Sequence, residues 1–267
     1  MRKKILMYKT PVVGPNFLGS PSSIDFLPAG RPGWFWRTKK GDIPIDHNIV
    51  VSKKGRLQAR CDDERLEVIE HIMALKFLIG LDQVILAPHN PWPPYLGGAG
   101  GYAKQLSKSW LQTDYDFGTI EPKRDSLVQL NNKLATEVSI AKSKTPGLSI
   151  TVHSHWAPLP QYQDTVTLES INVRQDILNA RPQGYPAHRE YFADLATMLG
   201  WPNKKYVSWI DRSKPLIETS YEWWCHAVQD CLGELALCHY QKIPSAKVLR
   251  WCAGHKEMLE AIKISFS

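Results

Sequence analysis

Two ionisable side chains share one face of a predicted helix near the C-terminus. Within CHAVQDCLGELAL, residues 225–237, His226 and Asp230 are four residues apart and most of their neighbours are apolar. A spacing of four places both groups on the same side of a helix. Because a buried imidazole and a buried carboxylate are costly unless they are paired or bound to a metal, this HxxxD spacing indicates a place where one cation can bridge both groups.

The HxxxD spacing alone leaves a plainer explanation open. Nine histidines make a chance match unsurprising, and a hydrogen bond between His226 and Asp230 would satisfy both groups. A catalytic zinc also needs a third protein ligand and an open position for water. The segment VIEHIMAL offers His71 as that ligand and Glu70 beside it as a general base. The alternative there is a surface glutamate next to a core histidine.

A third motif makes the set more specific. Gly254 and His255, in RWCAGHKEML, lie between a predicted strand and a predicted helix, where a side chain can project into a cleft. With EH, HxxxD and GH in this order and at these spacings, the chain resembles the zinc-dependent UDP-3-O-acyl-N-acetylglucosamine deacetylase family, LpxC. The likeness extends over residues 68–106, and again from residue 222 to the C-terminus, and ILNARPQGY is similar to a further segment of the family.

The resemblance implies an α+β fold, a two-domain β-α-α-β sandwich of the LpxC type with the active site between the halves. The two domains are expected over residues 1–118 and 119–267. The polar, turn-rich stretch 113–125 is interpreted as the linker between them, since it shows no apolar period.

The resemblance also assigns roles to five residues. It implies that His71, His226 and Asp230 hold Zn²⁺. Glu70 would be the base that activates the zinc-bound water, and His255 the cation that stabilises the oxyanion and protonates the leaving amine. General chemistry agrees, because zinc lowers the pKa of bound water toward about 7 and a carboxylate can then take the proton.

Departures from the family concern substrate recognition. Pro182 stands where the family has a threonine that helps to hold the oxyanion, and Ala227 stands where it has a substrate-binding lysine. Residues 97–99 read Gly-Gly-Ala where the family has Asp-Gly-Ser. The segment 185–222, which in the family shelters a fatty-acyl chain, is hard to align, so a reshaped pocket is expected.

Further pocket residues can be suggested from the sequence. His153 and His155 are two apart on a predicted strand and could chelate a rival metal; we interpret His155 as structural and His153 as a residue of the substrate cleft. Pro182 is a substrate-binding candidate by its place in the family motif. Trp223 and Trp224 could stack on a sugar or a base, although aromatic clusters more often belong to a core.

The elements that must position these groups follow from the apolar pattern. A first helix is expected over residues 62–80, with Gly80 as its end, and a second over residues 102–112. NIVVSKKGRLQARC predicts a hairpin about Gly55, and QVILAP, SLVQL, TEVSIAK and GLSITVHSHW predict strands. The HxxxD helix is apolar almost all round and should be buried.

Composition and charge limit the classes of protein. The 267 residues are 43% apolar and include 10 tryptophans, enough for a packed core. No apolar run reaches the roughly 20 residues of a membrane-spanning helix, and MRKKILMYKTP lacks the apolar core of a signal peptide. Five cysteines without a CxxC pair fit a reducing compartment, so we expect the protein in the cytoplasm.

The formal charge of +7 favours an anionic partner. The basic residues are scattered and no nucleic-acid-binding signature is present, so no nucleic acid is expected. Peripheral contact with the inner membrane and the oligomeric state stay open.

The sequence thus predicts a zinc-dependent deacetylase acting on an N-acylated amino sugar, with a nucleotide-linked sugar among the candidates, similar to the deacetylase of lipid A biosynthesis. Two alternatives stay open. One is a relative that hydrolyses another amide, in peptidoglycan or a small acylated amine. The other is a non-catalytic binding module on the same scaffold.

Overall fold

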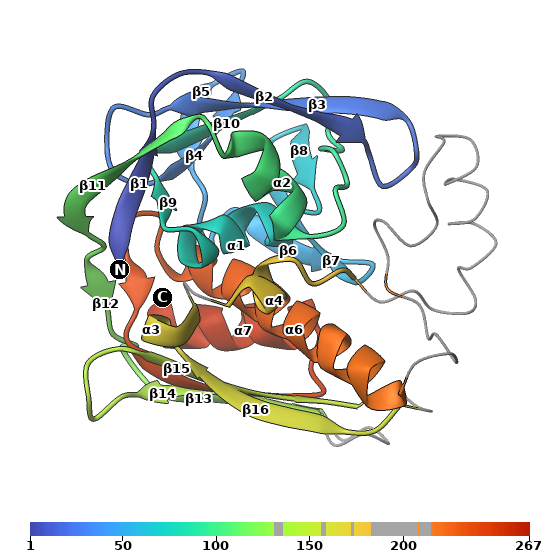
Figure 1. Cartoon of the computed structure of the whole chain (residues 1–267). Coiled ribbons are helices and arrows are strands. Elements are labelled where there is room, and N and C mark those ends of the chain that lie inside the picture. Colours follow the sequence, from blue (N-terminus) through green and yellow to red (C-terminus); the bar gives the residue numbers. More distant parts are fainter. Residues whose placement is uncertain (131–135, 156–158, 172–173, 183–207, 209–214) are drawn as a thin grey trace.

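The protein has sheets on the outside and helices between them (Figure 1), as seen in a computed structural model. The structure describes residues 1–130, 136–155, 159–171, 174–182, 208 and 215–267. Helices and several mixed sheets make up these parts of the chain, so the predicted α+β class is confirmed. None of the helices in these parts is long and apolar enough to cross a membrane.

Within the residues that the structure describes, three sheets lie in the upper part of the molecule in Figure 1. The largest has the order β2 (Thr10–Pro15), β3 (Pro21–Pro28), β10 (Val84–Pro88), β4 (Trp34–Thr38) and β5 (Gly41–Pro44). A second has the order β11 (Trp110–Asp116), β1 (Arg2–Leu6) and β9 (Leu81–Asp82). A third has the order β6 (Val50–Lys53), β7 (Arg56–Cys61) and β8 (Glu64–Glu67), so the hairpin expected about Gly55 is confirmed.

Among the described residues, the lower part of the molecule in Figure 1 contains a five-stranded sheet. Its order is β13 (Ser126–Leu130), β14 (Thr136–Lys142), β18 (Ala246–Trp251), β15 (Leu148–Ser154) and β16 (Tyr162–Thr167). Alternate residues of β15, namely Leu148, Ile150 and Val152, are buried against the helices, as a half-buried strand requires. A short parallel pair, β12 (Thr119–Ile120) with β17 (Ile243–Pro244), lies apart from this sheet.

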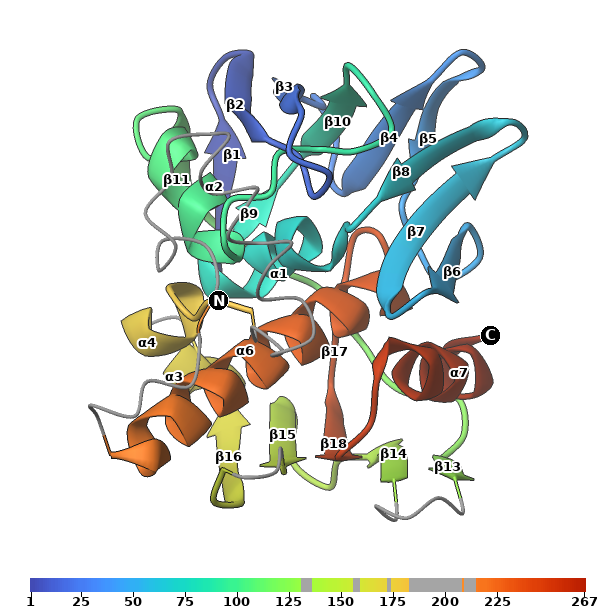
Figure 2. The ribbon, with the colours of Figure 1, turned by 90° about the vertical axis from the view of Figure 1, so that its right-hand side faces the viewer.

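The helices fill the space between these sheets. In the described parts of the chain they are α1 (Glu70–Leu78), α2 (Ala99–Leu106), α3 (Leu168–Ile171), α4 (Gln175–Leu178), α6 (Leu216–Leu235), the 3₁₀ turn η2 (Ala236–Cys238) and α7 (His255–Phe266). Helix α1 packs against α6, while α6 and α7 cover the lower sheet (Figure 2). Because α1 carries the EH motif and α6 the HxxxD motif, the two motifs lie next to each other where these helices pack together.

The contact between α1 and α6 is unusually close at Gly233. A Cβ atom on this glycine would lie 2.0 Å from the carbonyl oxygen of Glu70. Helix α6 is buried continuously from Trp223 to its end, which confirms the burial expected for the HxxxD helix. A residue without a side chain is therefore needed for α1 to lie directly over α6.

The structure corrects three predicted elements. The helix expected over residues 102–112 is α2, which begins at Ala99 and ends at Leu106, while residues 110–112 belong to strand β11. The helix expected over residues 62–80 begins only at Glu70, because β7 and β8 form a hairpin whose turn contains Asp62 at φ 50°. The acidic residues that suggested a helix start belong to this turn and strand. Strand β11 pairs with β1 and occupies part of the predicted linker 113–125. The domain boundary at residue 118 stays a prediction.

Candidate metal centre

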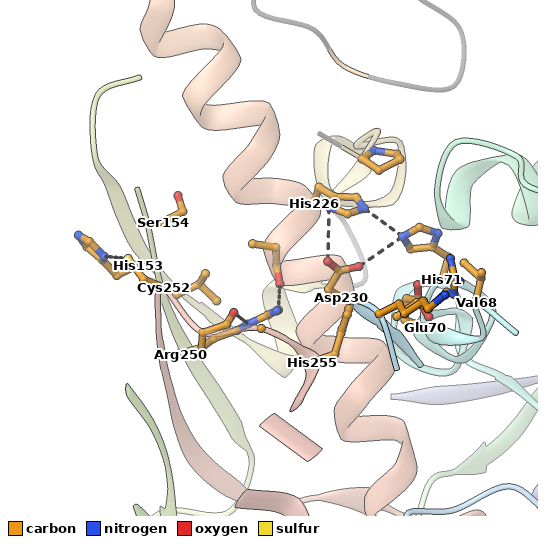
Figure 3. Close-up of a pocket in the computed structure, with 18 of the residues that line it drawn as sticks. Val68, Glu70, His71, His153, Ser154, His226, Asp230, Arg250, Cys252 and His255 are labelled. Atoms are coloured by element: carbon orange, nitrogen blue, oxygen red, sulfur yellow. Dashed lines mark hydrogen bonds and ion pairs between the residues drawn. The ribbon is translucent and has the colours of Figure 1, made fainter. Parts of the chain in front are cut away.

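Three predicted ligands converge where α1 meets α6 (Figure 3). His71 is the second residue of α1, and His226 and Asp230 lie one turn apart on α6. His71 Nε2 is 2.9 Å from His226 Nε2 and 3.3 Å from Asp230 Oδ1, while His226 Nδ1 is 3.5 Å from Asp230 Oδ2. One potential ligand atom from each residue lies within 4.8 Å of the others. The residues form a group that could hold a metal ion.

The chemistry of these side chains fits a cation. The Nε2 atoms of His71 and His226 face each other, and at most one of them can donate a proton to the other. His226 Nδ1 is buried and accepts or donates no hydrogen bond within the described parts of the chain. A cation accepting lone pairs from both rings would satisfy them better, and two imidazoles with a carboxylate leave an open coordination position for zinc.

The charge states of the group also suit metal binding. Burial lowers the pKa of His226 to about 4, so this ring is neutral at pH 7, as a ligand must be. Burial alone would raise the pKa of Asp230, but the neighbouring imidazoles hold it below the usual range. The carboxylate is therefore ionised.

Glu70 lines the same pocket as the three candidate ligands. Its side chain is 4% exposed, and Oε2 accepts a hydrogen bond of 3.2 Å from the Leu57 backbone N–H. Burial raises the pKa of this carboxyl above its ordinary value. A carboxylate with a raised pKa is a better proton acceptor, which is what a general base requires.

His255 opens α7 directly after Gly254 and also lines the pocket. Its Nδ1 is 2.6 Å from Glu234 Oε1, and Glu234 is fully buried. Burial by itself would lower the pKa of His255, but the hydrogen bond and charge of Glu234 raise it to about 9. His255 is therefore an imidazolium at neutral pH, with a proton to give.

Glu234 and Arg250 are residues that the sequence interpretation missed. Arg250, on β18, lies 3.5 Å from Glu234 through Nη1 and donates to the carbonyl oxygens of Ala227 and Ala253. Glu234 had a readable signal, because it continues the helical spacing of His226 and Asp230 as HxxxDxxxE. The pairing with Arg250 depends on tertiary contacts and had no comparable signal.

The Glu234 contact leads to a prediction about pH. If His255 acts as an acid, kcat/KM should fall as the pH rises through about 9, because the imidazolium then loses its proton. Glu234→Gln should move this decline to lower pH, since the charge that holds the proton is removed. Glu234→Asp keeps the negative charge, so its kcat/KM should decline at a pH closer to that of the wild type. A pH profile of kcat/KM for the three proteins measures this, and an unmoved profile in Glu234→Gln would contradict it.

The remaining substrate-binding candidates divide between pocket and core. His153 and Pro182 line the pocket, which has a volume of about 600 Å³. His153 lies away from the metal group, beside Cys252 (Figure 3), and its ring stacks on Trp251 with centroids 3.6 Å apart. His155 also lines the pocket. Within the described residues, however, only the group of His71, His226 and Asp230 has three metal-binding side chains this close together.

Trp223 and Trp224 were predicted to contact substrate, but the structure places them in the core. They are 2% and 0% exposed, and neither is among the residues lining the pocket. The Trp224 indole donates to the Val152 carbonyl oxygen of β15, so the ring joins α6 to the lower sheet. Most of the segment 185–222, where a reshaped pocket was expected, lies outside the described residues.

Helices α1 and α6 and the start of α7 thus place five side chains in one pocket. A buried pair of histidines with an aspartate, next to a glutamate and a protonated histidine, is typical of metal-dependent hydrolases. A profile of the LpxC family, described as UDP-3-O-acyl N-acetylglycosamine deacetylase, matches residues 16–264. The chain therefore belongs to this deacetylase family. In a search of curated proteins, none matched the chain.

Proposed function

We propose that this chain is a zinc-dependent amide hydrolase that removes an acetyl group from the nitrogen of an amino sugar. In this proposal His71, His226 and Asp230 hold zinc, Glu70 is the general base and His255 is the general acid. The observation that carries the proposal is that all five side chains line one pocket, with the three ligand candidates in mutual contact. Family membership supports the deacetylase chemistry.

The proposed reaction assigns separate proton steps to Glu70 and His255. Bound zinc would supply a Lewis acid that makes water acidic and polarises the amide carbonyl. Glu70 takes a proton from the attacking water as oxygen adds to the carbonyl carbon. His255 gives its proton to the amine nitrogen as the carbon–nitrogen bond breaks, and Glu234 keeps that proton on His255 beforehand. The products are acetate and a free amino sugar.

Two pocket residues favour a substrate that departs from the usual one of the family. Ala227 and Pro182 both line the pocket. A methyl group and a pyrrolidine ring offer no charge or hydrogen-bond donor to a substrate. This favours the alternative of a family member specialised for another amide, such as one in peptidoglycan or a small acylated amine. A nucleotide-linked substrate, contact with a membrane and a cytoplasmic location stay predictions.

A comparison of substrates tests the proposal. Acetate release should be measured from UDP-3-O-acyl-N-acetylglucosamine, from N-acetylglucosamine and from a peptidoglycan fragment, with the protein loaded with zinc. Turnover of the first at the highest kcat/KM supports a role like that of the lipid A enzyme, and preference for another supports the specialised relative. Zinc bound at about one per chain without acetate release from any of the three would favour a binding module instead.

A further inference from the structure

Tyr95 is held rigidly at the wall of the pocket. It lies in the proline-rich loop between β10 and α2, where its backbone N–H donates to the Pro15 carbonyl oxygen over 2.6 Å. Its ring packs edge-on against Phe17, with centroids 5.4 Å apart, and contacts Val68 in a small apolar cluster. The side chain is 7% exposed. These contacts hold the ring in place without using its hydroxyl group.

The Tyr95 ring also lies close to the candidate metal centre. Its centroid is 6.3 Å from that of His71. A phenol hydroxyl keeps its proton at neutral pH, because the ordinary pKa of tyrosine is about 10. The Tyr95 hydroxyl makes no hydrogen bond with the described parts of the chain, whereas the hydroxyl of nearby Tyr102 donates to the Pro94 carbonyl oxygen.

The proposed reaction offers a use for a donor of this kind. When water adds to the amide carbon, the carbonyl electron pair moves onto oxygen and creates an oxyanion. His255 must give its proton to the leaving amine, so it cannot also keep that proton on the oxyanion while the intermediate collapses. Pro182 lines the pocket without a donor, and its own carbonyl oxygen accepts from the Ser208 N–H. A side chain that retains its proton throughout would add to the oxyanion stabilisation that bound zinc would supply.

We propose that the Tyr95 hydroxyl donates a hydrogen bond to the oxyanion of the tetrahedral intermediate. This rests on the proposed amide hydrolysis. Tyr95 would then be a catalytic residue in its own right, with a task distinct from those of Glu70 and His255. The hydroxyl neither gains nor loses its proton during the step, because it only stabilises charge that develops on the carbonyl oxygen and disappears when the carbonyl forms again.

The test compares Tyr95→Phe with Tyr102→Phe. Both changes remove one buried phenol hydroxyl from the same stretch of chain, but only Tyr95 lines the pocket. In Tyr95→Phe, kcat for acetate release should fall by about 10²- to 10³-fold with KM nearly unchanged. Tyr102→Phe should keep kcat and lose some thermal stability, because the Pro94 carbonyl loses its donor. A higher KM with kcat intact in Tyr95→Phe would overturn the proposal.

A binding measurement makes the test independent of turnover. The phosphonamidate analogue of N-acetylglucosamine carries a tetrahedral anionic group in place of the acetyl group. Its dissociation constant for the zinc-loaded protein should rise by about ten- to a hundredfold in Tyr95→Phe, because a hydrogen bond to a charged group is lost. Zinc content should not change. Equal affinity in wild type and variant would refute the role of Tyr95, whereas an inactive wild type that still shows this difference would refute the proposed turnover alone.

Discussion

Glu70→Gln is expected to retain zinc and to lower the rate of amide hydrolysis by about 10²- to 10⁴-fold, the usual contribution of a general base. Glutamine has nearly the same shape as glutamate but cannot take a proton from water. Its side-chain oxygen can still accept the hydrogen bond that Leu57 donates to Glu70, so the start of α1 should keep its position. The measurements are kcat for acetate release, zinc content and the melting temperature.

Glu64→Gln is the matched control for this change. Glu64 also accepts a hydrogen bond from a backbone N–H, that of Lys39, but it does not line the pocket. The control should therefore keep its turnover. Unchanged turnover in Glu70→Gln would remove Glu70 from the role of base. A loss of zinc in that variant would instead indicate that the carboxylate helps to hold the metal.

Short motifs made the candidate site readable from the sequence. The spacing of four residues places His226 and Asp230 on one face of one helix. Their proximity could therefore be predicted without knowing the fold. The approach of His71 to them depends on α1 lying across α6, which only the family resemblance could suggest in advance. Gly233 gives the physical reason, since its missing side chain admits the Glu70 backbone.

Other features could not be read because tertiary contacts decide them. Residues 62–64 look like the acidic start of a helix. In the structure they belong to the hairpin that β7 and β8 form by pairing with each other. Trp223 and Trp224 look like stacking platforms, but their place on the buried side of α6 puts them in the core. Tyr95 sits in a loop without periodicity, and its position depends on a hydrogen bond to Pro15, about eighty residues earlier in the chain.

His226→Ala should remove zinc binding together with activity. The variant keeps only His71 and Asp230 of the three candidate ligands, fewer than a catalytic zinc site uses. Zinc content should fall from about one per chain to well below one, and hydrolysis should fall by at least about a thousandfold. In wild type, a chelator should lower the melting temperature and added zinc should restore it, because a ligand that binds only the folded state stabilises it. The variant should show no such response.

His153→Ala is the matched control for the loss of a histidine. It makes the same substitution in the same pocket, but His153 lies outside the metal group and contacts Cys252 and Trp251 instead. This variant should keep about one zinc per chain and the stabilisation that zinc gives. If His226→Ala also kept a tightly bound zinc, the ion would have to be held elsewhere. The pocket's two imidazoles and the Asp230 carboxylate would then be explained as a hydrogen-bonded pairing across the α1–α6 contact, and the hydrolytic proposal would lose its metal.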